Sequence, residues 1–145
     1  MPETQSLILH ASCVALEGRG LLITGTSGQG KSALALQLMA YGAQLVADDR
    51  VLLRQMDGQV VASAPEPIRG LVEARFMGLL HAQIRSPVPV ALLADLDEAE
   101  TERLPVRHTT RLLGQEVARV KRVDGAHFAP ALMQFLRCGA LDPDA

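Results

Sequence analysis

Residues 25–32 have the types and the spacing that bind the phosphates of a nucleotide. Gly25, Gly30, Lys31 and Ser32 fit the pattern G-x-x-x-x-G-K-[ST]. In this pattern the glycines let backbone N–H groups turn toward a phosphate, the lysine adds positive charge, and the serine hydroxyl can bind Mg²⁺. The sequence therefore predicts a phosphate-binding loop made of Gly25, Thr26, Ser27, Gly28, Gln29, Gly30, Lys31 and Ser32.

Two adjacent carboxylates follow this loop at a distance that could place them in the same site. Asp48 and Asp49 come directly after an apolar run at 44–47. Carboxylates can hold Mg²⁺ or accept a proton, and two neighbouring ones repel each other unless a cation lies between them. A solvated turn is the plain alternative, but the spacing from Lys31 favours a functional role.

The segments around these residues have the patterns of a strand, a helix and a second strand. The apolar run 21–24 is typical of a buried strand, and 31–41 has a broad apolar face suited to a helix. Gly42 stands where a glycine commonly ends a helix, and 44–47 is again strand-like. A right-handed strand–helix–strand crossover would bring the acidic pair close to the phosphate loop.

The segments before this unit also have strand character. Segments 6–10 and 12–16 are either one bent strand or two. A turn at 18–20 would let 12–16 pair with 21–24 as an antiparallel hairpin. Such a hairpin beside the phosphate loop is unusual for a Rossmann-type sheet.

Two further strand signals lie in the middle of the chain. Segments 51–54 and 59–63 flank Asp57-Gly58, a strong signal for a hairpin turn. The run VALLADL at 90–96 is continuously apolar and predicts a buried strand.

Three charged residues lie between these strand signals, among apolar neighbours. Arg69, Glu73 and Arg75 are candidates for lining a cleft, and the alternative is that they are ordinary solvated charges.

The last third of the chain carries weaker signals. We expect an exposed acidic connection at 97–102, a mobile basic loop at 104–111, and either a helix or a strand at 112–123. A final helix is expected over 126–138, ended by Gly139. The basic residues of the loop region are Arg103, Arg107, His108 and Arg111.

Composition narrows the class of protein. The 145 residues suit a single domain over 1–145, and 48% hydrophobic with 21% charged residues indicates a globular chain. A net charge of −2 gives no basic surface for nucleic acid, and no apolar run approaches the ~18 residues that span a membrane. The N-terminus lacks the pattern of a signal peptide, so we expect a cytoplasmic protein in which Cys13 and Cys138 are buried thiols.

Four motifs together resemble a known family, the catalytic domain of HPr kinase/phosphorylase. They are His10-Ala11, the loop at 25–32, LVADD at 45–49 and E-x-R at 73–75. The resemblance covers His10 to about Gly78 well and the remainder weakly. It implies an α/β fold: a phosphate-loop kinase domain similar to the phosphoenolpyruvate carboxykinase type, with a mixed β-sheet and flanking helices.

The resemblance also implies an activity and roles for named residues. The family uses ATP and Mg²⁺ to phosphorylate a serine of HPr, a small carrier protein of the phosphotransferase system, and many members reverse this with inorganic phosphate. The implied catalytic residues are His10, Lys31, Asp49 and Arg111, with Asp49 taking the serine proton and His10 orienting it. The implied magnesium ligands are Ser32, Asp48 and Glu73. An HPr-like carrier is the implied partner, and the family's hexamers make a homo-oligomer plausible.

This sequence departs from the family pattern at three places. Ala33 stands where Glu usually follows the loop serine, and Phe76 replaces the glycine after E-x-R. The late motif P-G-R-N is recognisable only as TTRL at 109–112. The residues implied for the kinase reaction are present, and the late motif leaves it open whether the protein also reverses the reaction. Two alternatives stay open as well: a small-molecule kinase on the same loop, and a nucleotide-binding regulatory module that has lost catalysis.

Overall fold

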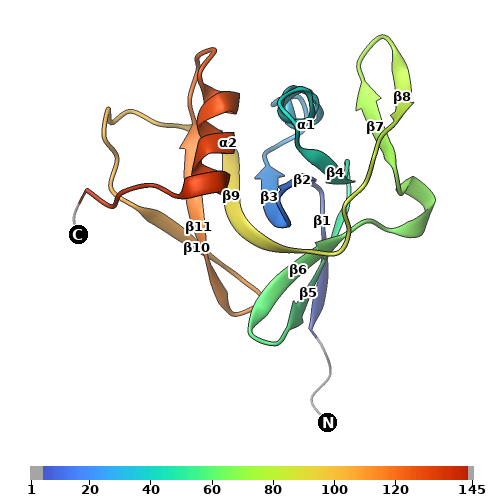
Figure 1. Ribbon diagram of the computed structural model, residues 1–145, viewed down its shortest axis with the longest axis horizontal. Coiled ribbons are helices and arrows are strands. Elements are labelled where there is room, and N and C mark those ends of the chain that lie inside the picture. The colour runs from blue at the N-terminus through green and yellow to red at the C-terminus, as the bar shows by residue number, and fades with distance from the viewer. Residues whose placement is uncertain (1–4, 144–145) are drawn as a thin grey trace.

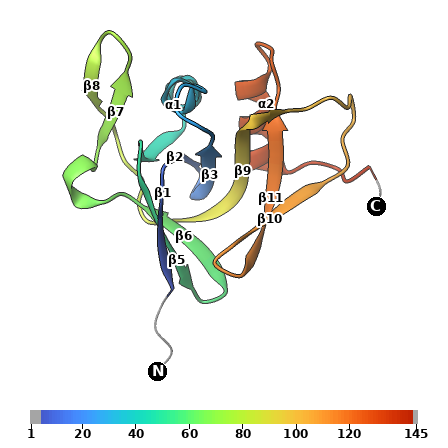
Figure 2. The same ribbon diagram turned by 180° about the vertical axis from the view of Figure 1, so that it is seen from behind.

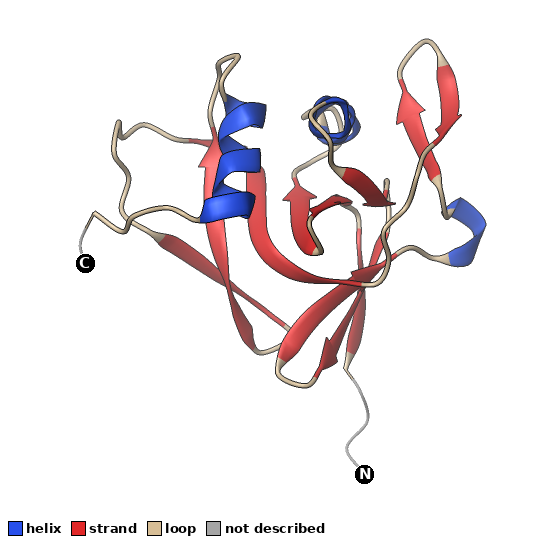
Figure 3. Cartoon of the chain, viewed as in Figure 1, coloured by secondary structure: helices blue, strands red, loops and turns tan. Residues whose placement is uncertain are grey.

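A curled, mixed β-sheet with two helices on one of its faces forms the body of the molecule (Figures 1 and 3). The computed structural model describes residues 5–143. Two α-helices, α1 (Lys31–Ala40) and α2 (Phe128–Cys138), and a short 3-10 helix η1 (Glu66–Ile68) occur in these residues. The strands are β1 (Ser6–Leu9), β2 (Ser12–Leu16), β3 (Arg19–Thr24), β4 (Gln44–Ala47), β5 (Val51–Met56), β6 (Gln59–Ser63), β7 (Leu71–Ala74), β8 (Gly78–His81), β9 (Val88–Ala99), β10 (His108–Leu112) and β11 (Gln115–Arg122).

The long strand β9 joins the two halves of the sheet. Its first residues pair antiparallel with β6, which continues through β5 to β1. Its later residues pair in parallel with β3 on one side and with β11 on the other, and β10 pairs with β11. Because one strand serves both halves, the sheet bends along β9, as the views from either side show (Figures 1 and 2).

The expected unit β3–α1–β4 is present, but its two strands are not neighbours. Strand β2 lies between them and pairs antiparallel with both. The hairpin predicted from 12–16 and 21–24 is therefore confirmed, and its turn is at Glu17-Gly18, one residue before the predicted position. Segment 6–16 forms two strands that pair with different partners, so β1 and β2 are separate.

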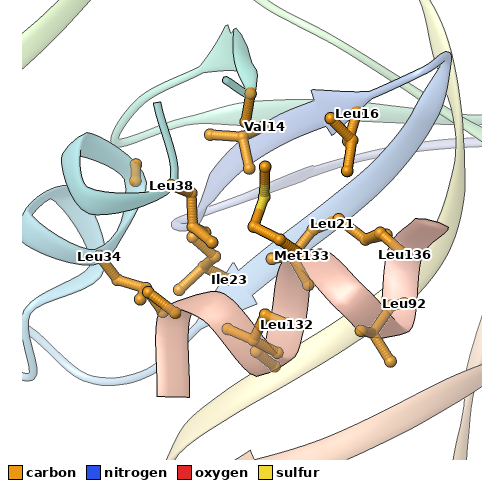
Figure 4. Packing of buried hydrophobic residues seen from close by; sticks show 14 of the residues in the cluster. Val14, Leu16, Leu21, Ile23, Leu34, Leu38, Leu92, Leu132, Met133 and Leu136 are labelled. Carbon is orange, nitrogen blue, oxygen red and sulfur yellow. The ribbon is translucent and has the colours of Figure 1, made fainter. Parts of the chain in front are cut away.

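Alternation along the central strands builds two apolar clusters, one on each face. Leu21 and Ile23 of β3 face the helices, whereas Leu22 between them faces the opposite side. The helix-side cluster gathers side chains of α1, α2 and the central strands, and Figure 4 shows Leu34 and Leu38 of α1 on the side that faces α2, with Leu38 near Met133. Each Å² of apolar surface removed from water stabilises the fold by ~25 cal/mol, so the burial of these side chains holds α1 in place at the end of β3.

Some of the remaining secondary-structure predictions are confirmed, and others have different bounds in the structure. The Asp57-Gly58 hairpin, the buried strand at 90–96 and the final helix ended by Gly139 are confirmed. The ambiguous segment 112–123 is mostly the strand β11. The basic segment 104–111 is a loop only as far as residue 107, since β10 begins at His108 and pairs with β11. The acidic connection at 97–102 starts later than predicted, because β9 continues to Ala99.

Two other properties bear on the sequence expectations. Cys13 is buried as predicted, but Cys138 is exposed at the last position of α2, so the expectation of two buried thiols is wrong for one of them. Neither helix of the described residues is long and apolar enough to cross a membrane.

Candidate active site

The predicted phosphate loop, the acidic pair and the E-x-R segment meet around one cavity. The cavity has a volume of about 240 Å³ and lies at the N-terminus of α1. Its lining residues are His10, Ser12, Ser27, Gly28, Gly30, Lys31, Ser32, Ala33, Asp49, Glu73 and Arg75. Segments that are far apart in the sequence therefore supply one polar, open site.

The backbone of the loop has the conformation that an anion site needs. Gly30 has φ 92° directly before α1, a left-handed angle that glycine adopts without strain. Gly25 has φ 155°, and a Cβ there would lie 3.1 Å from the Cβ of Leu96. The first turn of α1 contains no acidic residue and Gly30 makes no side-chain cap, so its N–H groups and the helix dipole favour a bound anion.

Lys31 lies inside this loop. Its side chain is largely buried, and its Nζ donates to the carbonyl oxygen of Gly25 at 2.7 Å and to that of Thr26 at 3.4 Å. The loop's own carbonyls thus hold the ammonium group at the cavity wall, where it adds a positive charge to the ring of N–H donors.

Asp48 lies beneath the cavity as an acceptor shared by three segments. Its Oδ1 accepts from the hydroxyls of Ser12 at 2.6 Å and of Ser32 at 2.7 Å, and its Oδ2 accepts from the backbone N–H of Glu73 at 2.9 Å. Asp48 is only 4% exposed and Ser12 is fully buried. One carboxylate therefore ties strand β2, helix α1 and the β7–β8 hairpin together.

Asp49 has the opposite environment. It lies at the mouth of the cavity with φ 70°, a left-handed angle that is uncommon for a residue other than glycine. Its Oδ1 is 3.3 Å from Nε2 of His10, and both side chains are about 60% exposed. The backbone twist at Asp49 separates the two carboxylates of the pair, so that one is buried and the other faces solvent.

A third carboxylate, from β9, supports the loop. The Oδ1 of Asp97 accepts from the backbone N–H of Thr26 at 2.9 Å and from its hydroxyl at 3.0 Å. These hydrogen bonds, the backbone one most, hold the pKa of Asp97 below its usual value, with a smaller contribution from the charge of Lys31. The sequence pattern placed Asp97 in an exposed connection. The available signal was that a strand parallel to β3 ends beside the loop that follows β3.

Not every predicted site residue lines the cavity. Gly25, Thr26 and Gln29 belong to the loop without lining the cavity, and Asp48 lies below it. Arg111 lies on β10, opposite Glu116, and its guanidinium donates to the carbonyl of Gly114. It is not brought together with the other predicted residues within this chain.

Among the three charged candidates for a cleft, two line it. Glu73 and Arg75 face the cavity, whereas Arg69 is 3.5 Å from Glu66 on the surface. Ser12 is a site residue that the sequence does not predict, because its partner Asp48 is 36 residues away and the local pattern indicates only a strand.

The residues present suit a nucleotide with Mg²⁺. The Ser32 hydroxyl donates its hydrogen to Asp48, so the lone pairs of its Oγ remain available to a cation. Residues 5–143 contain no group of three or more His, Cys, Asp or Glu side chains that could enclose a metal. Mg²⁺ does not need one, since it is usually bound through one or two protein groups, waters and substrate phosphates.

A second cavity, of about 280 Å³, lies between α2, β11 and residues 104–107. Its walls are mainly apolar side chains, among them Leu132 and Phe135. It has no phosphate loop and no acidic pair, so we place the chemistry at the first cavity.

Comparisons with known proteins agree with the motifs. The profile of the family described as HPr Serine kinase C-terminal domain matches residues 3–121. The HPr kinase/phosphorylase of Geobacillus kaustophilus is 39% identical over 124 residues, which are 80% of this chain and 38% of that protein. The HPr kinase/phosphorylase of Clostridium perfringens is 44% identical over 79 residues, which are 54% of this chain and 25% of that protein. The chain thus spans well under half the length of the curated relatives it matches.

A solved structure shares the fold. The structure of the Hpr(Ser) kinase/phosphatase from Coxiella burnetii superposes with a TM-score of 0.78 at 24% identity, covering 90% of this chain and 88% of the other. The mixed sheet with flanking helices expected from the sequence is therefore the fold of that protein, and this prediction is confirmed.

Proposed function

The chain belongs to the HPr serine kinase C-terminal domain family, and from this premise we propose that it transfers the terminal phosphoryl group of ATP to a serine of an HPr-like phosphocarrier protein. The observation that carries the proposal is the Asp49–His10 pair, which lies at the mouth of the cavity formed by the phosphate loop. A group that can accept a proton is thereby beside a group of donors that can hold phosphates, and phosphoryl transfer to a hydroxyl needs both.

The residues of this chain divide the work by position. The N–H groups of the loop and of the first turn of α1 hold the phosphates, and the ammonium group of Lys31 offsets negative charge on the transferred group. Ser32, with Asp48 or Glu73 acting directly or through water, would hold Mg²⁺, which when bound neutralises further phosphate charge. Asp48 keeps Ser32 oriented, because the serine hydroxyl donates to it.

Asp49 takes the proton of the acceptor serine as the serine oxygen attacks the phosphorus. Its carboxylate is exposed, so it is accessible to a serine on another protein. His10 orients the carboxylate, with its Nε2 3.3 Å from Oδ1 of Asp49. Arg111 does not line the cavity. We propose a catalytic role for it only if an assembly with another protein chain brings β10 to such a cavity.

The test is an incubation of the protein with ATP, Mg²⁺ and a purified HPr protein, followed by mass spectrometry of HPr. We expect phosphoserine on HPr with the wild-type protein and none with Lys31→Ala. ATP turnover without modified HPr would indicate a small-molecule kinase, and nucleotide binding without turnover would indicate a regulatory module. Incubating the phosphorylated HPr with inorganic phosphate then measures whether the reaction is also reversed.

A further inference from the structure

The β7–β8 hairpin carries apolar side chains that no residue within 5–143 covers. Phe76 is fully exposed, and Met77 and Leu79 are 76% and 66% exposed. The hairpin stands away from the body of the molecule beside α1 (Figures 1 and 2). Its tip therefore presents an aromatic ring and two long aliphatic side chains to solvent at one place.

The backbone at this tip is strained for the residue it contains. Phe76 has φ 68°, in the left-handed region, and the turn is closed by a hydrogen bond from Met77 N–H to the carbonyl of Ala74 at 2.9 Å. A bulky residue in this conformation is disfavoured, whereas glycine would adopt it freely. The chain thus keeps a phenylalanine at a position where it gains no packing and where glycine would relax the backbone.

The hairpin is continuous with the candidate active site. Glu73 and Arg75 of the same hairpin line the cavity, and the backbone N–H of Glu73 is held by Asp48. Phe76 follows Arg75 directly, so the apolar tip begins where the cavity wall ends. Strand β7 also packs against α1, so the hairpin is fixed relative to the phosphate loop.

We propose that Phe76, Met77 and Leu79 form a docking surface for the protein that carries the acceptor serine. This rests on the proposed function. A protein must bring its serine to Asp49 at the mouth of the cavity, and the tip is the apolar surface that borders this entrance. The partner surface is expected to expose apolar side chains next to that serine. Three side chains provide only a small contact, which suits a complex that must dissociate after each turnover better than a permanent contact between copies of this chain.

The experiment compares Phe76→Gly and Met77→Ser with the wild-type protein, measuring kcat and KM for HPr and the Kd for ATP. We expect the KM for HPr to rise about tenfold in each variant with kcat and the Kd for ATP unchanged, because aromatic residues and Met are enriched in interfaces and a few residues carry most of the binding energy. Phe76→Gly removes the strain, so its melting temperature should equal or exceed that of the wild type. The matched control is Met56→Ser, which replaces another exposed methionine, on β5, and should leave the KM for HPr unchanged.

Each outcome of these measurements supports or overturns the docking surface. An unchanged KM for HPr in either variant overturns the docking surface. So does dissociation of an oligomer caused by Phe76→Gly, which would assign the tip to a second copy of this chain. If the wild-type protein does not phosphorylate HPr, the proposed function fails. Titration of HPr by NMR then decides the docking surface separately: binding that Phe76→Gly weakens supports it, and no binding overturns it.

Discussion

Replacing Ser12 by alanine should destabilise the protein although the change removes a single oxygen atom. The hydroxyl is fully buried and donates to Asp48 at 2.6 Å, so its loss deletes a hydrogen bond to a buried carboxylate. Hydrogen bonds to charged groups contribute ~1.5–3 kcal/mol. We therefore expect the free energy of unfolding to fall by about 2 kcal/mol, which in a chain of this size lowers the melting temperature by roughly 6–8 °C.

Urea unfolding followed by circular dichroism measures this effect. Ser6→Ala, an exposed serine on β1, is the matched control and should stay within ~0.5 kcal/mol of the wild type. In an Asp48→Asn background the cost of Ser12→Ala should shrink, because the charged acceptor is gone and the two residues are coupled. A Ser12→Ala protein as stable as the control, or an equal cost in both backgrounds, would refute the view that Asp48 ties the site together.

Four further predictions follow from the same geometry. Lys31→Ala should keep the fold but weaken ATP binding and abolish transfer to HPr, measured by fluorescence titration and by phosphoserine yield; normal transfer would remove the lysine from the site. Asp49→Asn should lower kcat by at least ~100-fold with little change in the Kd for ATP, as expected for a missing proton acceptor, and a normal kcat would assign that role elsewhere. The carboxyl group of Asp97 has a lowered pKa, so its stabilising effect is present above the usual aspartate pKa and is lost as pH falls through the lowered value. The difference in the free energy of unfolding between wild type and Asp97→Asn should therefore shrink as the pH is lowered, as measured by acid titration of unfolding. A difference that stays constant with pH would contradict this. Burial raises the pKa of the Cys13 thiol and Cys138 is exposed, so a thiol reagent should modify one cysteine in the native protein and both after unfolding; rapid reaction of both in the native state would be inconsistent with the packing around β2.

Local signals in the sequence predicted the elements that position the phosphates. The glycine-rich loop, the helix after it and the Asp57-Gly58 hairpin each depend on residues close in sequence, where backbone preference decides the conformation. The acidic pair was placed correctly near the loop, because a strand after the helix must return to the same end of the sheet.

Contacts between distant segments could not be predicted in this way. Ser12 and Asp48 meet because β2 inserts between β3 and β4, an order that no local pattern specifies. Segment 112–123 fits a helix and a strand equally well, and it is its pairing with β9 and β10 that makes it mostly a strand. The catalytic role predicted for Arg111 rests on a weak motif, and its place on β10 is set by the pairing of β10 with β11.

The most direct test of the central claim is transfer of labelled phosphate from γ-labelled ATP to HPr by the wild-type protein. Two forms of HPr are compared, one with its acceptor serine and one in which alanine replaces it. The account predicts label on the serine form only, dependent on Mg²⁺ and absent with Lys31→Ala. An unlabelled serine form, in a reaction where the protein demonstrably binds ATP, would contradict the claim that this site phosphorylates a carrier protein.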